Sequence, residues 1–154
     1  MTAPDPTMAR VGEAMELAQT GRAAEARELF TQIWAELGPD GDPLHRVTVA
    51  HYMAHLQEDP HEELAWDLLA LEAVDGVTDR RAADAGATGP VAAFYPSLHL
   101  NLGEDYRKIG DNEAARRHLE LGLAAAGALS DDGYGQMIRG GLDGLAQRLG
   151  GAGR

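Results

Sequence analysis

Apolar residues recur along most of this chain at the spacing of an amphipathic helix. Within residues 9–38 they follow an i, i+3, i+4, i+7 pattern, first up to a break at Gly21 and then again up to Gly38-Pro39. Glycine directly after such a run is typical of a helix end, because it adopts the left-handed conformation there without strain. The pattern therefore predicts two antiparallel helices joined by a tight turn.

The same pattern recurs twice more, and strand signals are nearly absent. Asp42-Pro43 and Asp59-Pro60 each combine an acidic N-cap with a proline in the first turn of a helix. Gly110-Asp111 marks the connection between two further helices. We therefore expect an all-α protein made of helical hairpins. The elements expected in this single domain are hairpins at about 7–38, 43–75 and 94–127, a loop at about 76–93 with at most a short helix, and a capping helix at about 132–149.

Aligning the turns of the three hairpins indicates a repeat in which Phe30, Leu68 and Leu119 are equivalent. The third hairpin resembles the tetratricopeptide repeat (TPR). The matching residues are Leu102-Gly103, Tyr106, Gly110, Ala115 and Leu119, with His99 in place of the usual tryptophan and Gly122 in place of alanine. The resemblance implies a right-handed stack of about three hairpins and a capping helix, in which the first helix of each hairpin lines a concave groove.

TPR grooves hold a peptide or a partner helix, and most such proteins are scaffolds or adaptors. The resemblance therefore implies a protein- or peptide-binding module, and it favours an absence of catalysis without excluding an enzyme. Unbranched methionines suit adaptable apolar recognition, and Arg46 and Arg107 could hold a carboxylate. The groove residues implied by the resemblance are Met15, Arg46, Val49, Met53, Leu100, Glu104 and Arg107.

Histidines at unusual positions suggest an alternative site. His51 and His55 stand four residues apart on one helix, so they could present two imidazoles to one ion, and His99 could add a third ligand for zinc or copper. Tyr52 occupies the position of the glutamate in the metalloprotease motif H-E-x-x-H, so that motif is missing. A polar pocket for a small molecule, in an enzyme or a binding protein, and a purely structural role for the three histidines both remain open. No cofactor is predicted.

Composition narrows the partners and the setting. A formal net charge of −12 disfavours nucleic acid and anionic lipid as partners. The chain has no cysteine, no apolar run long enough to span a membrane and no secretory signal at its start, so we expect a cytoplasmic protein. A single lysine among many alanines and glycines is typical of a GC-rich bacterial genome, such as that of an actinobacterium. Apolar stripes on the end helices leave a homodimer open.

Overall fold

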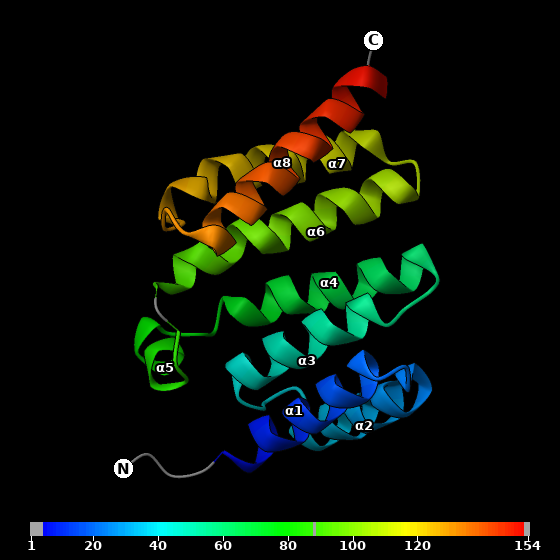
Figure 1. Cartoon of the computed structure of the whole chain (residues 1–154), viewed down its shortest axis with the longest axis vertical. Helices are drawn as coiled ribbons and strands as arrows, with labels where there is room; N and C mark the ends of the chain where they lie inside the picture. The colour runs from blue at the N-terminus through cyan, green and yellow to red at the C-terminus, as the bar shows by residue number, and fades with distance from the viewer. Residues whose placement is uncertain (1–4, 88, 153–154) are drawn as a thin grey trace. The chain divides into compact units, whose positions relative to one another are not determined.

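The computed structural model describes residues 5–87 and 89–152, and this part of the chain is all-helical (Figure 1). It contains eight α-helices, two short 3-10 helices and no strand. None of these helices combines the length and the apolar character needed to cross a lipid bilayer. The elements are α1 (Pro6–Gln19), α2 (Ala23–Leu37), α3 (Pro43–His55), α4 (Pro60–Val74), α5 (Asp79–Asp84), η1 (Val91–Phe94), α6 (Tyr95–Lys108), α7 (Asn112–Ala125), η2 (Ala126–Ala128) and α8 (Gly133–Ala152).

The chain divides into two compact units, unit 1 (residues 1–76) and unit 2 (residues 77–154). Unit 1 holds the hairpins α1/α2 and α3/α4, and α3 packs against both α1 and α2. Unit 2 holds α5 and the hairpin α6/α7, with α8 packed against both helices of that hairpin. The all-α class expected from the sequence is confirmed, and the segment expected to be a loop contains the short helix α5.

Local signals at the helix ends explain why the helices begin and stop where they do. The side chains of Asp42, Asp59 and Asp111 accept hydrogen bonds from backbone N–H groups of the first helical turn, at 2.9, 2.8 and 3.1 Å. Gly21 and Gly110 follow the first helix of their hairpins with φ values of +81° and +87°, which only glycine adopts without strain. The helix starts predicted at Asp42-Pro43 and Asp59-Pro60 are confirmed.

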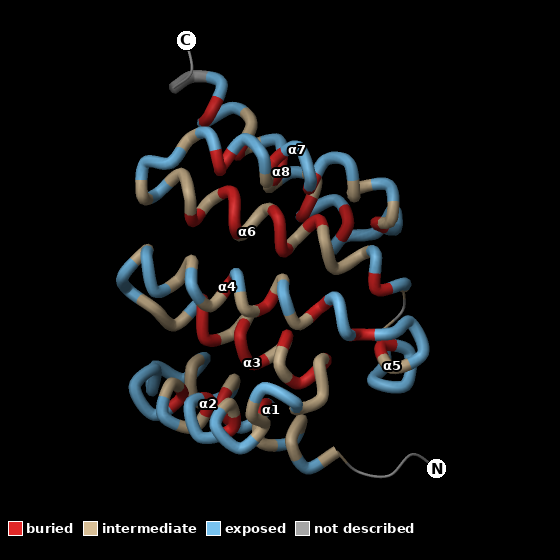
Figure 2. The backbone as a smooth tube through the Cα atoms, turned by 180° about the vertical axis from the view of Figure 1, so that it is seen from behind, coloured by how far each residue is buried: buried red, intermediate tan, exposed pale blue. Residues whose placement is uncertain are grey.

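The core of unit 1 lies between α1, α2 and α3, as the buried positions in Figure 2 indicate. Its aromatic side chains interlock: Trp34 of α2 meets Trp66 of α4 edge to face, with ring centroids 5.1 Å apart. The buried members of this core are Val11, Ala14, Phe30, Ile33, Val49 and Met53.

The helix α4 does not bury the leucine that the expected repeat makes equivalent to Phe30 and Leu119. Phe30 and Leu119 are buried, but Leu68 is 40% exposed and the neighbouring Asp67 is buried instead. The buried positions of α4 are Asp67, Ala70 and Val74, which share one face of the helix. The apolar pattern of the sequence points to Leu68 as the core residue, because a buried aspartate such as Asp67 does not fit that pattern.

The core of unit 2 forms where α8 crosses the α6/α7 hairpin (Figure 1). A Cβ atom added to Gly103 would lie 2.5 Å from the Cδ2 of Leu145, and one added to Gly122 would lie 2.8 Å from the Cδ2 of Leu142. The two glycines thus allow α8 to approach both helices of the hairpin closely. The buried members of this core are Ala115, Leu119, Leu129, Ile138, Leu142, Leu145 and Leu149.

Candidate binding pocket

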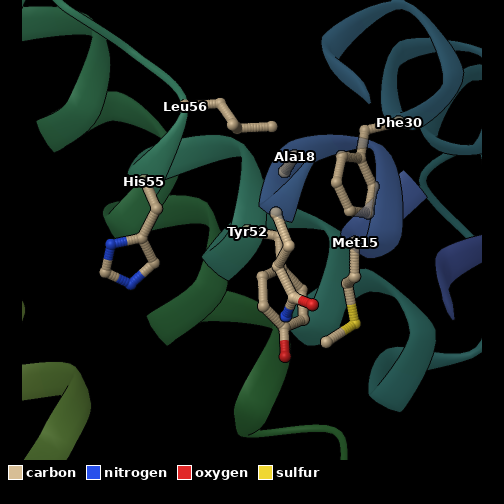
Figure 3. A pocket seen from close by; sticks show the side chains of 7 residues that line it. Met15, Ala18, Phe30, Tyr52, His55 and Leu56 are labelled. Carbon is tan, nitrogen blue, oxygen red and sulfur yellow. The ribbon is translucent and has the colours of Figure 1, made fainter. Parts of the chain in front are cut away.

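Unit 1 contains a small apolar pocket of about 100 Å³ between α1, α2 and α3 (Figure 3). Its volume is below the roughly 150 Å³ of an engineered cavity that holds benzene, so it suits a single aliphatic side chain. It opens to solvent rather than being sealed inside the core. The residues that line it are Met15, Ala18, Gln19, Phe30, Tyr52, His55 and Leu56.

Helix periodicity brings the lining residues together. On α1, Met15, Ala18 and Gln19 follow an i, i+3, i+4 spacing and share one face; Tyr52, His55 and Leu56 on α3 and its C-cap repeat that spacing. Phe30 of α2 stacks on Tyr52 with ring centroids 5.9 Å apart and closes the inner side of the pocket. Because α1 and α3 pack against each other, their two faces meet at this point.

Tyr52 supplies a polar group beside these apolar walls. Its hydroxyl is protonated at neutral pH, as in any tyrosine, and can donate a hydrogen bond, and burial raises its pKa further. Tyr52 was not among the groove residues expected from the sequence. Its neighbour on α3, Met53, was expected there instead. Met53 is buried in the core, whereas Tyr52 lines the pocket.

The structure separates the expected groove residues of unit 1. Met15 lines the pocket, whereas Val49 and Met53 are 0% and 4% exposed and pack in the core. Arg46 lies against α2, with its guanidinium carbon 4.2 Å from the ring centroid of Trp34, and it donates a hydrogen bond to the carbonyl of Gly38. The face of α3 that meets α1 at the pocket is therefore the one with Tyr52 and His55.

Two of the three expected groove residues of unit 2, Leu100 and Glu104, contact α8, and Arg107 binds Glu104. Leu100 would lie 2.6 Å from a Cβ atom added to Gly141, so the two helices touch there. Glu104 accepts hydrogen bonds from Arg107 at 3.0 Å and from Arg148 of α8. Burial opposes ionisation of Glu104, but the hydrogen bonds and charges of Arg148 and Arg107 lower the pKa of its carboxyl below the usual value. These side chains hold α8 on α6.

The histidines expected to form one site lie in different units. His51 and His55 are in unit 1, where their rings meet at right angles with centroids 4.6 Å apart, and His99 is in unit 2. Burial, reinforced by the nearby His55, lowers the pKa of His51 to about 4. At neutral pH His51 is therefore uncharged, and His55, which also lines the pocket, is the exposed member of the pair.

His99 has a partner that the sequence analysis missed. Its Nδ1 atom lies 3.0 Å from the Nδ1 of His118 on α7, so one ring donates and the other accepts a hydrogen bond. Tyr95 stacks on His99 and Tyr106 stacks on His118, which gives a ladder of four rings across α6 and α7. Burial lowers the pKa of both imidazoles, and for His118 the charges of His99 and Arg117 lower it further.

The histidine pairs supply few ligands for a metal ion. Among the residues that the structure describes, no group of three or more histidine, aspartate or glutamate side chains is arranged to hold one. The remaining buried histidine, His45, pairs with the carboxylate of Asp5 at 2.8 Å and joins the start of α1 to α3.

We found no match to this chain among protein-family models, curated proteins or solved structures. The pocket of unit 1 combines accessible apolar walls with the polar groups of Gln19, Tyr52 and His55, an arrangement typical of a binding site.

Proposed function

We propose that this protein is a TPR-type adaptor that binds a peptide or an extended segment of a partner protein and carries out no catalysis. The pocket between α1 and α3 is the observation that carries this proposal. It is open to solvent, it is large enough for one aliphatic side chain, and its walls are apolar. A pocket of this kind holds the anchor residue of a bound segment, and a few such anchors dominate the affinity of an interface.

The position of the pocket supports the same proposal. In the TPR stack implied by the third hairpin, the first helix of each hairpin lines the ligand groove. The pocket lies between α1 and α3, which are the first helices of the two hairpins of unit 1. Three hairpins, α1/α2, α3/α4 and α6/α7, with α8 as the cap, would make up the proposed array. The absence of cysteine fits a reducing compartment such as the cytoplasm.

Filling the pocket tests the proposal. The Ala18→Leu variant replaces a methyl group in the lining with an isobutyl group, which occupies the space of the anchor side chain. The Ala35→Leu variant makes the same change on the exposed face of α2 and is the matched control. A random peptide library displayed on phage is panned against the full-length wild-type protein and against both variants.

We expect peptides to be enriched on the wild-type protein and on Ala35→Leu but not on Ala18→Leu. In solution, measured by fluorescence anisotropy, the enriched peptides should bind Ala18→Leu about tenfold or more weakly, the loss typical of a blocked anchor pocket. Enrichment that is equal on all three proteins would show that the pocket is not the binding site. Circular dichroism melting of each variant verifies that the fold is intact.

The histidine pairs favour a second candidate, a protein that binds a metal ion or a small molecule. His51 and His55 touch, and His99 and His118 approach with ring nitrogens 3.0 Å apart, so each pair could offer two nitrogens. Elemental analysis of untagged protein purified without chelator tests this candidate, with His51→Ala and His99→Ala as variants. Near-stoichiometric zinc or copper that one variant loses would support this candidate. If the protein is instead a peptide-binding module, the His51→Leu variant should bind the peptide as tightly as the wild-type protein.

A further inference from the structure

The acidic character of the chain is concentrated in unit 1. Residues 1–76 contain fifteen aspartates and glutamates against four arginines, a formal charge of −11. Residues 77–154 contain ten acidic residues against nine basic ones, a formal charge of −1. The unit that contains the pocket therefore carries nearly all of the net charge, and its electrostatic potential attracts cationic ligands.

The four arginines of unit 1 are engaged within the unit. Arg10 pairs with Glu36, and Arg22 pairs with Glu25 at 2.5 Å. Arg27 donates a hydrogen bond to the carbonyl of Leu56 at 3.1 Å, and Arg46 lies over Trp34 and donates to Gly38, as described above. An acidic ligand that approached unit 1 would share each guanidinium with one of these contacts. Carboxylate recognition by Arg46, which the sequence suggested, would compete with its contacts to Trp34 and Gly38.

The surroundings of the pocket favour a positive charge. The helices α1 and α3 end at Gln19 and His55, which both line the pocket, and the C-terminal end of a helix carries a partial negative charge. Neither helix has a lysine or arginine in its own last turn, and only the end of α3 receives an arginine from another helix, since Arg27 of α2 donates to the carbonyl of its C-cap Leu56. The end of α1 therefore keeps its partial negative charge. The exposed Glu16 follows Met15 directly, and the exposed Glu58 lies two residues beyond Leu56.

We propose that the ligand of this pocket is a basic peptide: one aliphatic side chain of the peptide fills the pocket, and neighbouring arginines or lysines lie against Glu16, Glu58 and the end of α1. This inference rests on the proposed function and specifies the partner of the same site. The apolar side chain provides the anchor, and the basic residues select the peptide among others with a similar anchor. Screening by salt weakens the contribution of these surface charges.

The charge of the peptides selected from the random library tests the inference. The library contains acidic, neutral and basic sequences, so it favours no sign of charge. We expect the peptides that bind the wild-type protein but not Ala18→Leu to carry net positive charge next to a leucine, isoleucine or methionine. Their affinity should fall severalfold when the salt concentration rises from about 0.05 M to about 0.2 M.

Two substitutions separate the anchor from the charge. Replacing the apolar anchor of a selected peptide by serine should weaken binding about tenfold even though the basic residues remain, which excludes nonspecific attraction to an acidic protein. The double variant Glu16→Gln/Glu58→Gln should weaken the basic peptide severalfold and reduce the salt dependence. The double variant Glu62→Gln/Glu72→Gln, which removes two exposed charges of α4, a helix that contributes no residue to the lining, is its control.

The outcomes distinguish this inference from the function on which it rests. Pocket-dependent peptides that are neutral or acidic would overturn the inference and leave peptide binding intact. The absence of any pocket-dependent peptide would overturn both. Basic peptides that bind Ala18→Leu as tightly as the wild-type protein would also overturn the inference, because charge alone would then explain the binding.

Discussion

At the scale of single residues, the surroundings hold His51 in its neutral form. Its imidazole is half-buried beside Tyr52 and His55, and the pKa falls from 6.5 to about 4. Since the folded protein resists protonation of this ring and the unfolded chain does not, the neutral ring stabilises the fold only while the pH is high enough. The contribution of His51 to the free energy of unfolding is complete above pH 6.5 and declines as the pH falls from 6.5 toward 4.

We therefore predict that the His51→Gln variant is less sensitive to acid than the wild-type protein. Between pH 7 and pH 5 the wild-type protein should lose about 1–2 kcal/mol more of its free energy of unfolding than the variant, since each unit of pKa shift is worth about 1.4 kcal/mol and partial exposure reduces the effect. Urea unfolding at both pH values, followed by circular dichroism, measures the difference.

The His61→Gln variant is the control for this prediction, because His61 is exposed in the first turn of α4. It should show the same acid sensitivity as the wild-type protein. If His51→Gln also loses as much stability as the wild-type protein between pH 7 and pH 5, then His51 is not held neutral by the fold.

Histidine partners on one helix could be predicted from the sequence, and those on different helices could not. The i, i+4 spacing of His51 and His55 implies that their rings are neighbours, and the rings do touch. The contact between His99 and His118 depends on how α6 and α7 are aligned within their hairpin, which no spacing along the chain specifies. The sequence therefore does not indicate that His118 is the partner of His99.

At the scale of the helices, their ends could be predicted but the faces of α3 could not. Caps and turn glycines act within a few residues, so Asp42, Asp59 and Gly110 mark helix ends directly in the sequence. By contrast, α3 has apolar residues nearly all the way round. Its buried residues are Leu44, His45, Val47, Val49, Ala50, Met53 and Ala54. Buried positions on several sides of one helix give no single apolar face from which its orientation could be deduced.

Close packing of α8 on α6 leads to a prediction for Gly103. The Gly103→Ala variant should lower the free energy of unfolding of unit 2, because the new methyl group would meet Leu145, which is fully buried and has little room to move. Overpacking of this kind costs about 1–3 kcal/mol, which exceeds the gain of about 1 kcal/mol from replacing glycine by alanine in a helix. Hydrogen exchange of the α6 and α8 amides measures the change.

The matched variant is Gly140→Ala on α8, where an added Cβ atom meets nothing within 4 Å. It should stabilise the protein by about 0.5–1 kcal/mol through helix propensity alone. Equal stabilisation by both substitutions would mean that α8 does not lie as close to α6 as the structure has it.

At the scale of the whole molecule, the two units differ in charge far more than in size. The formal charge of −11 on unit 1 implies repulsion among its own acidic side chains, and unit 2 is almost neutral. The sequence contains this asymmetry in full, but the boundary at residues 76 and 77 that reveals it comes from the packing of the helices.

We predict that salt stabilises unit 1 more than unit 2. Raising the ionic strength from about 0.01 M to about 0.15 M shortens the Debye length from roughly 30 Å to roughly 8 Å and screens the repulsion within unit 1. Hydrogen exchange measured by mass spectrometry should then show a larger gain in protection for peptides from residues 5–76 than for peptides from residues 89–152. An equal or opposite response would contradict this explanation.

The most direct test of the proposed binding site uses the methionines as reporters. Met15 lines the pocket of unit 1, and Met137, which is 63% exposed on α8 of unit 2, lies outside it. With the methionine methyl groups labelled with ¹³C, a basic peptide selected from the library is titrated into the full-length protein and followed by NMR. We predict that the Met15 signal shifts on binding and that the Met137 signal stays in place; a shift of Met137 with Met15 unchanged would contradict the account.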